Sequence, residues 1–150
     1  MKKFIALGIV LILALTLAAC GAKGGKKDSI VGTWVTDTDW LFSQEGFNAL
    51  KKLDPEFTAE EYTEMQKLYT TLPEDYLSKA CMTFNADGTG TIVSILVDPD
   101  ATENDITVEE ITYTAENGKL TIQYWRFTDT LDYSLKNGRL ILAGIQYKRK

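Results

Sequence analysis

Few residue types in this sequence can carry catalytic chemistry. Its 150 residues include no histidine, which excludes Ser-His-Asp and Cys-His nucleophile systems and zinc sites that need a histidine ligand. Two pairs of acids, Asp37 with Asp39 and Glu109 with Glu110, suggest a carboxylate pair for glycoside hydrolysis. Glu109 and Glu110 are adjacent in an expected strand, so their side chains face opposite ways. Since there is also no phosphate-binding loop, nucleophile elbow or redox motif, we expect a protein that is not an enzyme.

A metal site is the next chemistry to consider. Residues 98–105 place oxygen ligands at alternate positions, as a calcium loop does. The segment lacks the glycine at the sixth position and the correctly spaced glutamate of an EF-hand loop. We therefore predict a solvated hairpin loop here, no metal site, and no cofactor.

Aromatic side chains are the remaining candidates, because they can line a pocket for an apolar ligand. The candidate ligand-binding residues are Trp40, Phe42, Phe47, Tyr62 and Tyr69, together with Tyr124, Trp125 and Phe127. The alternative is that the same rings pack helices against a sheet. The elements that carry these residues decide between the two.

Two similar hairpins are the clearest structural signal. Asn117-Gly118 and Asn137-Gly138 lie twenty residues apart in matching surroundings, and Asn-Gly favours a type I′ turn, whose two central residues have positive φ. Two-residue loops fix which residues lie opposite each other and gather the apolar ones on one face. The predicted opposite pairs are Tyr113 with Ile122, Ala115 with Leu120, Tyr133 with Leu142, and Leu135 with Leu140.

Further short strands extend this pattern. A third hairpin is expected at residues 85–88, with a loop of two or three residues, so its register stays open. Strands are expected at residues 30–37, 80–84, 89–97, 106–115, 119–127, 130–136, 139–143 and 145–148. About eight short strands with tight turns predict a mainly β fold, an antiparallel meander that closes into a barrel.

A helical insertion follows the first strand, at about residues 40–79. Residues 58–61 form a capping box, with Phe57 and Tyr62 placed to staple it. An apolar stripe at helical spacing continues from Tyr62 to Leu72 and ends at Pro73. A second helix is predicted from about residue 40 to residue 52. Strand connections of this length usually cap something.

Residues 1–19 have the pattern of an export signal. Lys2 and Lys3 precede sixteen residues without charge, as in a secretory signal peptide. As a helix these sixteen residues extend roughly 24 Å, which is less than the ~30 Å hydrocarbon core of a bilayer. A segment that is removed is therefore a better interpretation than a permanent span.

The end of this segment, Leu17-Ala18-Ala19-Cys20-Gly21, resembles the lipobox of bacterial lipoproteins. The resemblance implies that the Cys20 thiol is diacylated and that the chain is cut before Cys20. It also implies an extracytoplasmic protein whose partner is a membrane, reached through the lipid anchor: the cell membrane, or the outer membrane if the host has two. Residues 20–29, rich in glycine and lysine, are expected to form a flexible tether. Cys81 then has no partner for a disulfide.

The charge of the mature chain argues against one class of partner. Residues 1–19 contain two of the 16 basic residues and none of the 21 acidic ones. The remainder therefore has 14 basic and 21 acidic side chains, a net charge of −7. A domain with this balance is not expected to bind nucleic acid.

A family resemblance covers most of residues 30–148. Gly32 and Trp34 form a Gly-x-Trp motif, followed by Phe-Asn-Ala-Asp-Gly-Thr-Gly-Thr at residues 84–91 and by the two Asn-Gly hairpins. This ordered set resembles the lipocalin-like domains of bacterial lipoproteins. The resemblance implies that Trp34 closes the base of the barrel under a basic residue from near the C-terminus, for which Arg149 is the candidate. The helical insertion departs from the simple lipocalin barrel.

These observations predict one barrel domain, residues 30–150, behind a lipid anchor. An eight-stranded barrel either just holds a small ligand or just fills itself with side chains. The favoured function is binding of a small apolar or amphipathic ligand or of an envelope component. The alternative is a protein-interaction or scaffold module with a filled barrel. An enzyme that uses carboxylates alone is the third hypothesis.

Overall fold

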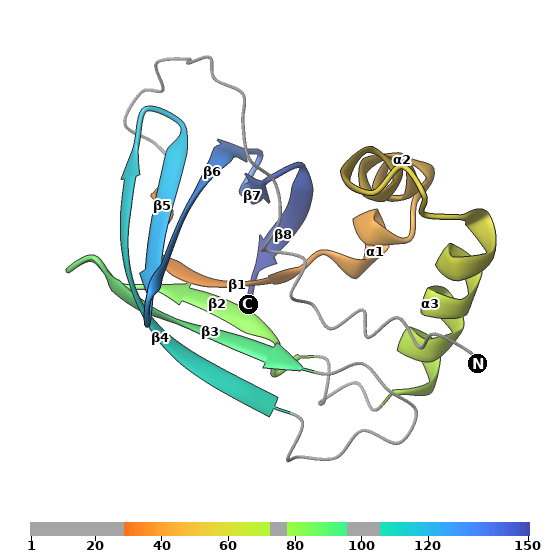
Figure 1. The fold of residues 1–150 in the computed structure, drawn as a ribbon, viewed down its shortest axis with the longest axis horizontal. Helices are drawn as coiled ribbons and strands as arrows, with labels where there is room; N and C mark the ends of the chain where they lie inside the picture. The colour runs from red at the N-terminus through yellow and green to blue at the C-terminus, as the bar shows by residue number, and fades with distance from the viewer. Residues whose placement is uncertain (1–28, 73–77, 96–105) are drawn as a thin grey trace.

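The protein is described here by a computed structural model for residues 29–72, 78–95 and 106–150. Each strand pairs antiparallel with the next, and the first pairs with the last, so the sheet closes into an eight-stranded barrel (Figure 1). The strands are β1 (Gly32–Thr36), β2 (Cys81–Phe84), β3 (Thr89–Ile95), β4 (Ile106–Glu116), β5 (Lys119–Tyr124), β6 (Phe127–Lys136), β7 (Arg139–Leu142) and β8 (Ile145–Arg149). The predicted fold class, a mainly β meander closed into a barrel, is confirmed.

The two Asn-Gly hairpins have the predicted geometry. Asn117 and Gly118 have φ of 53° and 76°, and Asn137 and Gly138 have φ of 52° and 72°, as a type I′ turn requires. All four predicted pairs are present in the β4–β5 and β6–β7 registers. The turn residues therefore set which side chains enter the barrel.

The third hairpin, between β2 and β3, has the longer of the two loops considered. The backbone amide of Asn85 donates to the carbonyl of Thr89 at 2.8 Å, which leaves residues 86–88 as a three-residue loop. Gly88 has φ of 84°, the left-handed residue that commonly ends such loops.

The boundary between β5 and β6 differs from the expectation. The strand predicted at residues 119–127 ends at Tyr124, and Phe127 begins β6, where it pairs with Tyr124. Trp125 and Arg126 make the turn, with Trp125 at φ of 45°. Residues 119–127 contain no Gly, Asn or Pro after Lys119, so the usual turn signals are missing.

The helical insertion consists of α1 (Thr38–Leu41), α2 (Gln44–Leu53) and α3 (Ala59–Thr71). The predicted capping box is present at the start of α3. The backbone amide of Glu61 donates to Oγ1 of Thr58 at 3.2 Å, and the amide of Thr58 donates to the Glu61 carboxylate at 2.8 Å. These two bonds satisfy backbone donors that a helix start otherwise leaves free.

The single helix predicted at residues 40–52 is wrong, because the chain breaks between α1 and α2. Oγ of Ser43 accepts from the amide of Gly46 at 3.2 Å and caps α2. A side chain at Gly46 would overlap the carbonyl groups of Trp40 and Leu41. The glycine thus permits a sharp turn that apolar spacing does not reveal.

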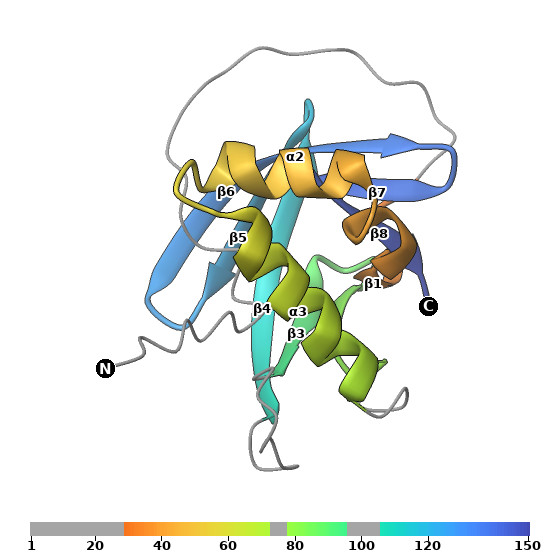
Figure 2. The same cartoon turned by 90° about the vertical axis from the view of Figure 1, so that its right-hand side faces the viewer.

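The hydrophobic core joins the barrel and the insertion. Seven of the described barrel side chains are almost fully inaccessible to solvent: Trp34, Phe84, Ile95, Leu120, Ile122, Leu140 and Leu142. All but Ile95 belong to one main cluster. Buried residues of the helices belong to the same cluster: Leu41, Leu50, Phe57, Met65 and Tyr69. Figure 2 shows the three helices together in front of the strands. The insertion is therefore an integral part of the core.

The meander sorts the turns between the two ends of the barrel. Because neighbouring strands run in opposite directions, the β5–β6 and β7–β8 turns lie at the end where β1 leads into α1. We call this the insertion end. The β2–β3, β4–β5 and β6–β7 turns lie at the other end, with Ser29 and the C-terminus; we call it the termini end.

Candidate functional site

The barrel interior is the first candidate site, and side chains occupy it. A cavity of about 20 Å³ remains between β1, β2, β3 and β8, little more than the space of one water molecule. Its lining residues are Trp34, Thr36, Ala80, Cys81, Met82, Ile92, Val93, Ser94 and Tyr147. Cys81 is a half-buried free thiol, less enclosed than a core thiol. This cavity is too small for an organic ligand.

Trp34 closes the termini end of the barrel. Its side chain is 1% exposed, and its Nε1 donates to the carbonyl of Ile30 at 2.7 Å. Cζ of Arg149 lies 4.4 Å from the centre of the indole ring. Nη1 of Arg149 donates to the carbonyl of Val31 and Nη2 to the carbonyl of Ser29, both at 2.9 Å. The structure thus places Arg149 over Trp34, the arrangement that the family resemblance implies.

Gly32 serves the same closure. Its φ of 134° lies in a region of backbone conformation that residues other than glycine avoid. A Cβ atom at this position would overlap the guanidinium of Arg149. The spacing of Gly32 and Trp34 therefore has a packing reason: the glycine leaves room for the cation that covers the tryptophan.

The aromatic candidates of the insertion pack against one another. The ring centres of Phe42 and Tyr69 lie 5.1 Å apart, and those of Phe47 and Tyr62 lie 4.9 Å apart. The Tyr62 hydroxyl donates to the carbonyl groups of Leu41 and Ser43, each at 3.0 Å. Such contacts hold helices together and leave little ring surface for a ligand.

Trp40 and Tyr69 sit at the join between helices and barrel. Trp40 is half-buried against the core cluster. Burial raises the pKa of Tyr69 to about 12, and burial also raises the pKa of Tyr147 on β8, with Tyr69 adding to the effect. Tyr69 therefore fills the mouth of the barrel beside Tyr147, which supports the packing interpretation.

The remaining aromatic candidates form a separate group at the β5–β6 turn. We call Tyr124, Trp125 and Phe127 the aromatic tip. Trp125 and Phe127 are 79% and 55% exposed. The Phe127 ring centre lies 5.8 Å from that of Tyr124 and 6.1 Å from that of Trp125. The turn lies clear of the helices in both views (Figures 1 and 2), so the eight candidate ligand-binding residues do not form one site.

Polar groups adjoin the aromatic tip. The Tyr124 hydroxyl donates to Oδ2 of Asp129 at 2.9 Å. Burial, the bond to Asp129 and the charge of Glu109 together raise the pKa of Tyr124 to about 12. Cζ of Arg126 lies 4.9 Å from the centre of the Trp125 ring. Sequence reasoning identified Tyr124 and Trp125 but not these neighbours, because the register that assembles them depends on the unpredicted turn.

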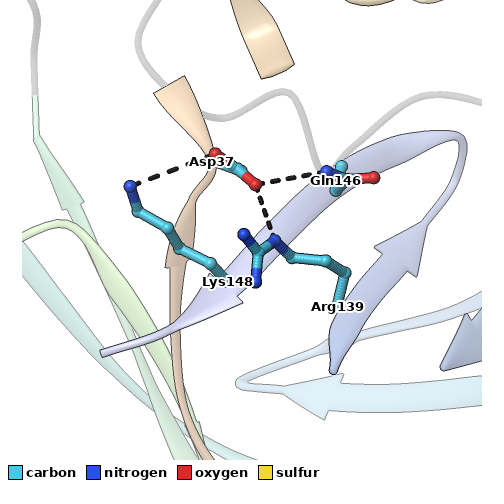
Figure 3. Close-up of polar contacts among 4 residues, drawn as sticks. All are labelled: Asp37, Arg139, Gln146 and Lys148. Carbon is cyan, nitrogen blue, oxygen red and sulfur yellow. Dashed lines mark hydrogen bonds and ion pairs between the residues drawn. The ribbon is translucent and has the colours of Figure 1, made fainter. Parts of the chain in front are cut away.

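A buried carboxylate lies where β1 meets α1 (Figure 3). Asp37 is 4% exposed, and its Oδ2 accepts from Nε of Arg139 at 2.8 Å and from Nε2 of Gln146 at 3.1 Å. Nζ of Lys148 lies 4.0 Å from Oδ1. Burial raises the pKa of Asp37, but these hydrogen bonds and positive charges outweigh it and lower the pKa overall.

The side chains that donate hydrogen bonds to the Asp37 carboxylate come from strands β7 and β8. The Asp37 amide also donates to the carbonyl of Gln146 at 3.1 Å. Asp39, the other member of the predicted acidic pair, is exposed, as are Glu109 and Glu110. Asp37 therefore ties the start of the insertion to β7 and β8. Sequence reasoning missed that role because its partners lie about a hundred residues further along the chain.

Other expected features fall outside the described residues, namely Cys20, the export signal, most of the tether and the acidic loop at residues 98–105. Within residues 29–72, 78–95 and 106–150, no cluster of three or more His, Cys, Asp or Glu side chains could hold a metal ion. In the same part of the chain no helix has the length and apolarity to cross a membrane. A scan of protein-family models and searches of curated proteins and solved structures match nothing.

Proposed function

We propose that this protein is a lipid-anchored, extracytoplasmic lipoprotein without enzymatic activity, whose filled barrel presents a contact surface to an envelope component. The packing of the barrel interior carries the proposal. Pockets for small organic ligands typically enclose about 300–1,000 Å³, whereas the cavity between β1, β2, β3 and β8 measures about 20 Å³. Binding at the exposed rim of the barrel is therefore better supported than binding in an enclosed interior cavity.

The aromatic tip is the best-supported contact surface. In the described part of the chain, the large exposed apolar side chains are Val108, Trp125 and Phe127, and two of these three adjoin each other at the tip. Trp and Arg are among the residues that dominate binding energy at interfaces. The aromatic rings of the insertion helices are half-buried or buried and pack against each other.

The anchor rests on the lipobox-like residues that end in Cys20. Arg149 holds the carbonyl groups of Ser29 and Val31, so the tether leaves the domain at the termini end. Nine residues of a Gly-rich coil reach roughly 15–18 Å on average. The aromatic tip lies at the opposite end of β5 and β6 from the point where the tether joins the domain.

Support for a role without catalysis comes from the acidic residues. Asp37 is engaged by Arg139, Gln146 and Lys148, and Asp129 accepts the Tyr124 hydroxyl. A carboxylate pair for hydrolysis needs a raised pKa in one of its members. The pKa of Asp37 is instead lowered.

Native mass spectrometry of the full chain, extracted from membranes of its own host in mild detergent, tests the filled barrel. We expect the mass of the lipidated protein alone. A bound apolar molecule that unfolding releases would contradict the proposal and favour the small-ligand alternative. Displacement of an apolar fluorescent dye by candidate lipids gives an independent check.

The anchor has its own test. Replacing Cys20→Ser removes the thiol that would be acylated, so we expect loss of fatty-acid labelling and release of the protein from the membrane fraction. Cys81→Ser is the matched control and should leave both unchanged. Equal labelling of the wild type and Cys20→Ser would contradict the anchor.

A further inference from the structure

The residue at the β5–β6 turn is unusual for its backbone conformation. Trp125 has φ of 45°, and the equivalent first turn positions of the β4–β5 and β6–β7 hairpins are occupied by Asn117 and Asn137. Positive φ disfavours bulky side chains by roughly 1–2 kcal/mol, whereas Asn tolerates it. A tryptophan at this position therefore opposes local backbone preference.

Packing within the chain does not explain the tryptophan either. Its side chain is 79% exposed, the largest exposed fraction among the large apolar residues of the described chain. Its contacts are the neighbouring Phe127 ring and the Arg126 guanidinium. Strained residues that persist without a structural benefit are typical of binding sites. The tip is accordingly a surface for something outside the chain.

The area of the tip restricts what that partner is. Aromatic side chains bury about 150–250 Å² each when enclosed, so the exposed parts of Trp125 and Phe127 together offer about 300 Å². A stable protein interface needs about 800 Å² per partner. A platform of one or two rings instead matches the apolar face of a sugar ring, whose axial C–H groups stack on aromatic rings.

Charge argues against lipid headgroups and anionic polymers. The chain after residue 19 has a net charge of −7, and Glu109 and Asp129 lie beside Tyr124 at the tip itself. Both are repelled by anionic surfaces.

The polar groups suit hydroxyl recognition. Asp129 and Glu109 present carboxylate oxygens, which accept hydrogen bonds from hydroxyl groups, and Arg126 presents donors beside the Trp125 ring. On β5 and β6 the side chains of Tyr124, Phe127 and Asp129 share one face of the sheet, because Tyr124 pairs with Phe127 and Ile122 pairs with Asp129. Apolar and hydroxyl-binding groups therefore meet on one small surface.

We propose that the aromatic tip binds an uncharged polysaccharide, with one sugar ring stacked on Trp125 and hydroxyl groups of the same glycan chain bonded to Arg126 and Asp129. This inference rests on the proposed function, and it specifies the chemistry of the envelope component. The proposed glycan site consists of the side chains of Tyr124, Trp125, Arg126, Phe127, Asp129 and Glu109.

Co-sedimentation of the full-length lipidated protein in detergent micelles with insoluble glycans tests the proposal. The probes are the uncharged insoluble glycans chitin, cellulose and curdlan. We expect saturable binding to at least one of them. Trp125→Asn should weaken it about tenfold or more, as truncation of a central aromatic residue does, and Trp125→Phe should retain most of it.

Two controls separate a binding effect from unfolding. Asn tolerates positive φ better than a bulky residue does, so Trp125→Asn should unfold at about the same urea concentration as the wild type. Val108→Ala removes an exposed apolar side chain, 62% accessible on β4, outside the tip. It should leave glycan binding unchanged.

Three results would overturn the glycan proposal. The first is no binding to any of the three glycans, or binding that Trp125→Asn leaves intact. The second is Trp125-dependent flotation with vesicles of phosphatidylethanolamine and phosphatidylglycerol. The third is Trp125-dependent cross-linking to an envelope protein, which would leave the tip as a contact surface but change its partner. If Trp125→Asn alters none of these interactions, the proposed function fails as well.

Discussion

The contribution of single buried residues to the stability of this protein depends on the hydrogen bonds and charged contacts that they make. Asp37 is buried among Arg139, Gln146 and Lys148, and Trp34 is enclosed beneath Arg149. The described side chains include no buried nitrogen or oxygen atom without a hydrogen-bond partner. Removing one partner of such a pair exposes the other to a desolvation penalty, so both contacts make measurable predictions.

Asp37→Asn should lower the free energy of unfolding by about 1–3 kcal/mol at pH 7. The folded-state pKa of Asp37 lies below its ordinary value, so the unfolded chain binds more protons between the two values. The stabilisation is therefore complete above about pH 4–5 and is lost as the pH falls through the folded pKa. Urea unfolding from pH 7 to pH 2 should show the wild type and the variant converging at low pH.

Asp132→Asn is the matched control for this experiment. Asp132 pairs with Lys119 at 2.6 Å on the surface, where its side chain is 61% exposed. Exposed pairs contribute about 0–1 kcal/mol, so its effect should be small. Parallel pH profiles of wild type and Asp37→Asn would show that the carboxylate contributes no proton-linked stability.

Arg149→Met should destabilise the domain by about 1–2 kcal/mol. The variant keeps aliphatic contact with Trp34 but loses the cation over the ring and the two hydrogen bonds to Ser29 and Val31. Arg126→Met is the control, because Arg126 also covers an indole ring but at the exposed turn. Equal urea midpoints for the two variants would argue against a structural role for Arg149.

At the scale of elements, local signals set the start of α3 and the turns of two hairpins. Thr58 and Glu61 bond reciprocally, and the Asn-Gly turns have the expected positive φ. The boundary between α1 and α2 was missed because it depends on Ser43 and on the close approach allowed by Gly46. A helix start or a turn can be predicted from the sequence where the residues that form it are neighbours along the chain.

Thr58→Ala tests the start of α3. It removes the hydroxyl that accepts from the Glu61 amide, so we expect a loss of about 1 kcal/mol in the free energy of unfolding. Thr63→Ala, in the same helix, removes a hydroxyl that donates to the Ala59 carbonyl, a bond that adds little. Urea unfolding of both variants measures the difference, and similar losses would mean that the cap does not stabilise the fold.

For the molecule as a whole, the main feature is that side chains from distant parts of the described chain pack into one hydrophobic core. Leu140 and Phe84, from opposite parts of the sequence, are both fully buried in the cluster that also contains Met65 of α3. Because the cavity described between β1, β2, β3 and β8 measures only about 20 Å³, we place the proposed contact surface at the β5–β6 turn.

Leu140→Ala should lower the free energy of unfolding by about 2–5 kcal/mol, because the barrel cannot collapse around the missing side chain. Val108→Ala, at an exposed position of β4, should change it by less than about 0.5 kcal/mol. A small effect of Leu140→Ala would indicate a loosely packed interior and reopen the ligand-binding alternative.

The register of both Asn-Gly hairpins and the start of α3 could be predicted from the sequence, because each depends on residues within a few positions of one another. The fold class followed from the regular spacing of short strands and tight turns along the chain. The three-dimensional packing was needed to show which aromatic rings pack within the insertion and which are exposed at the β5–β6 turn. It alone brought Asp37 to Arg139 and Arg149 to Trp34. Closing the barrel joins β1 to β8, and that long-range pairing, which no local pattern encodes, fixes the environment of each candidate residue.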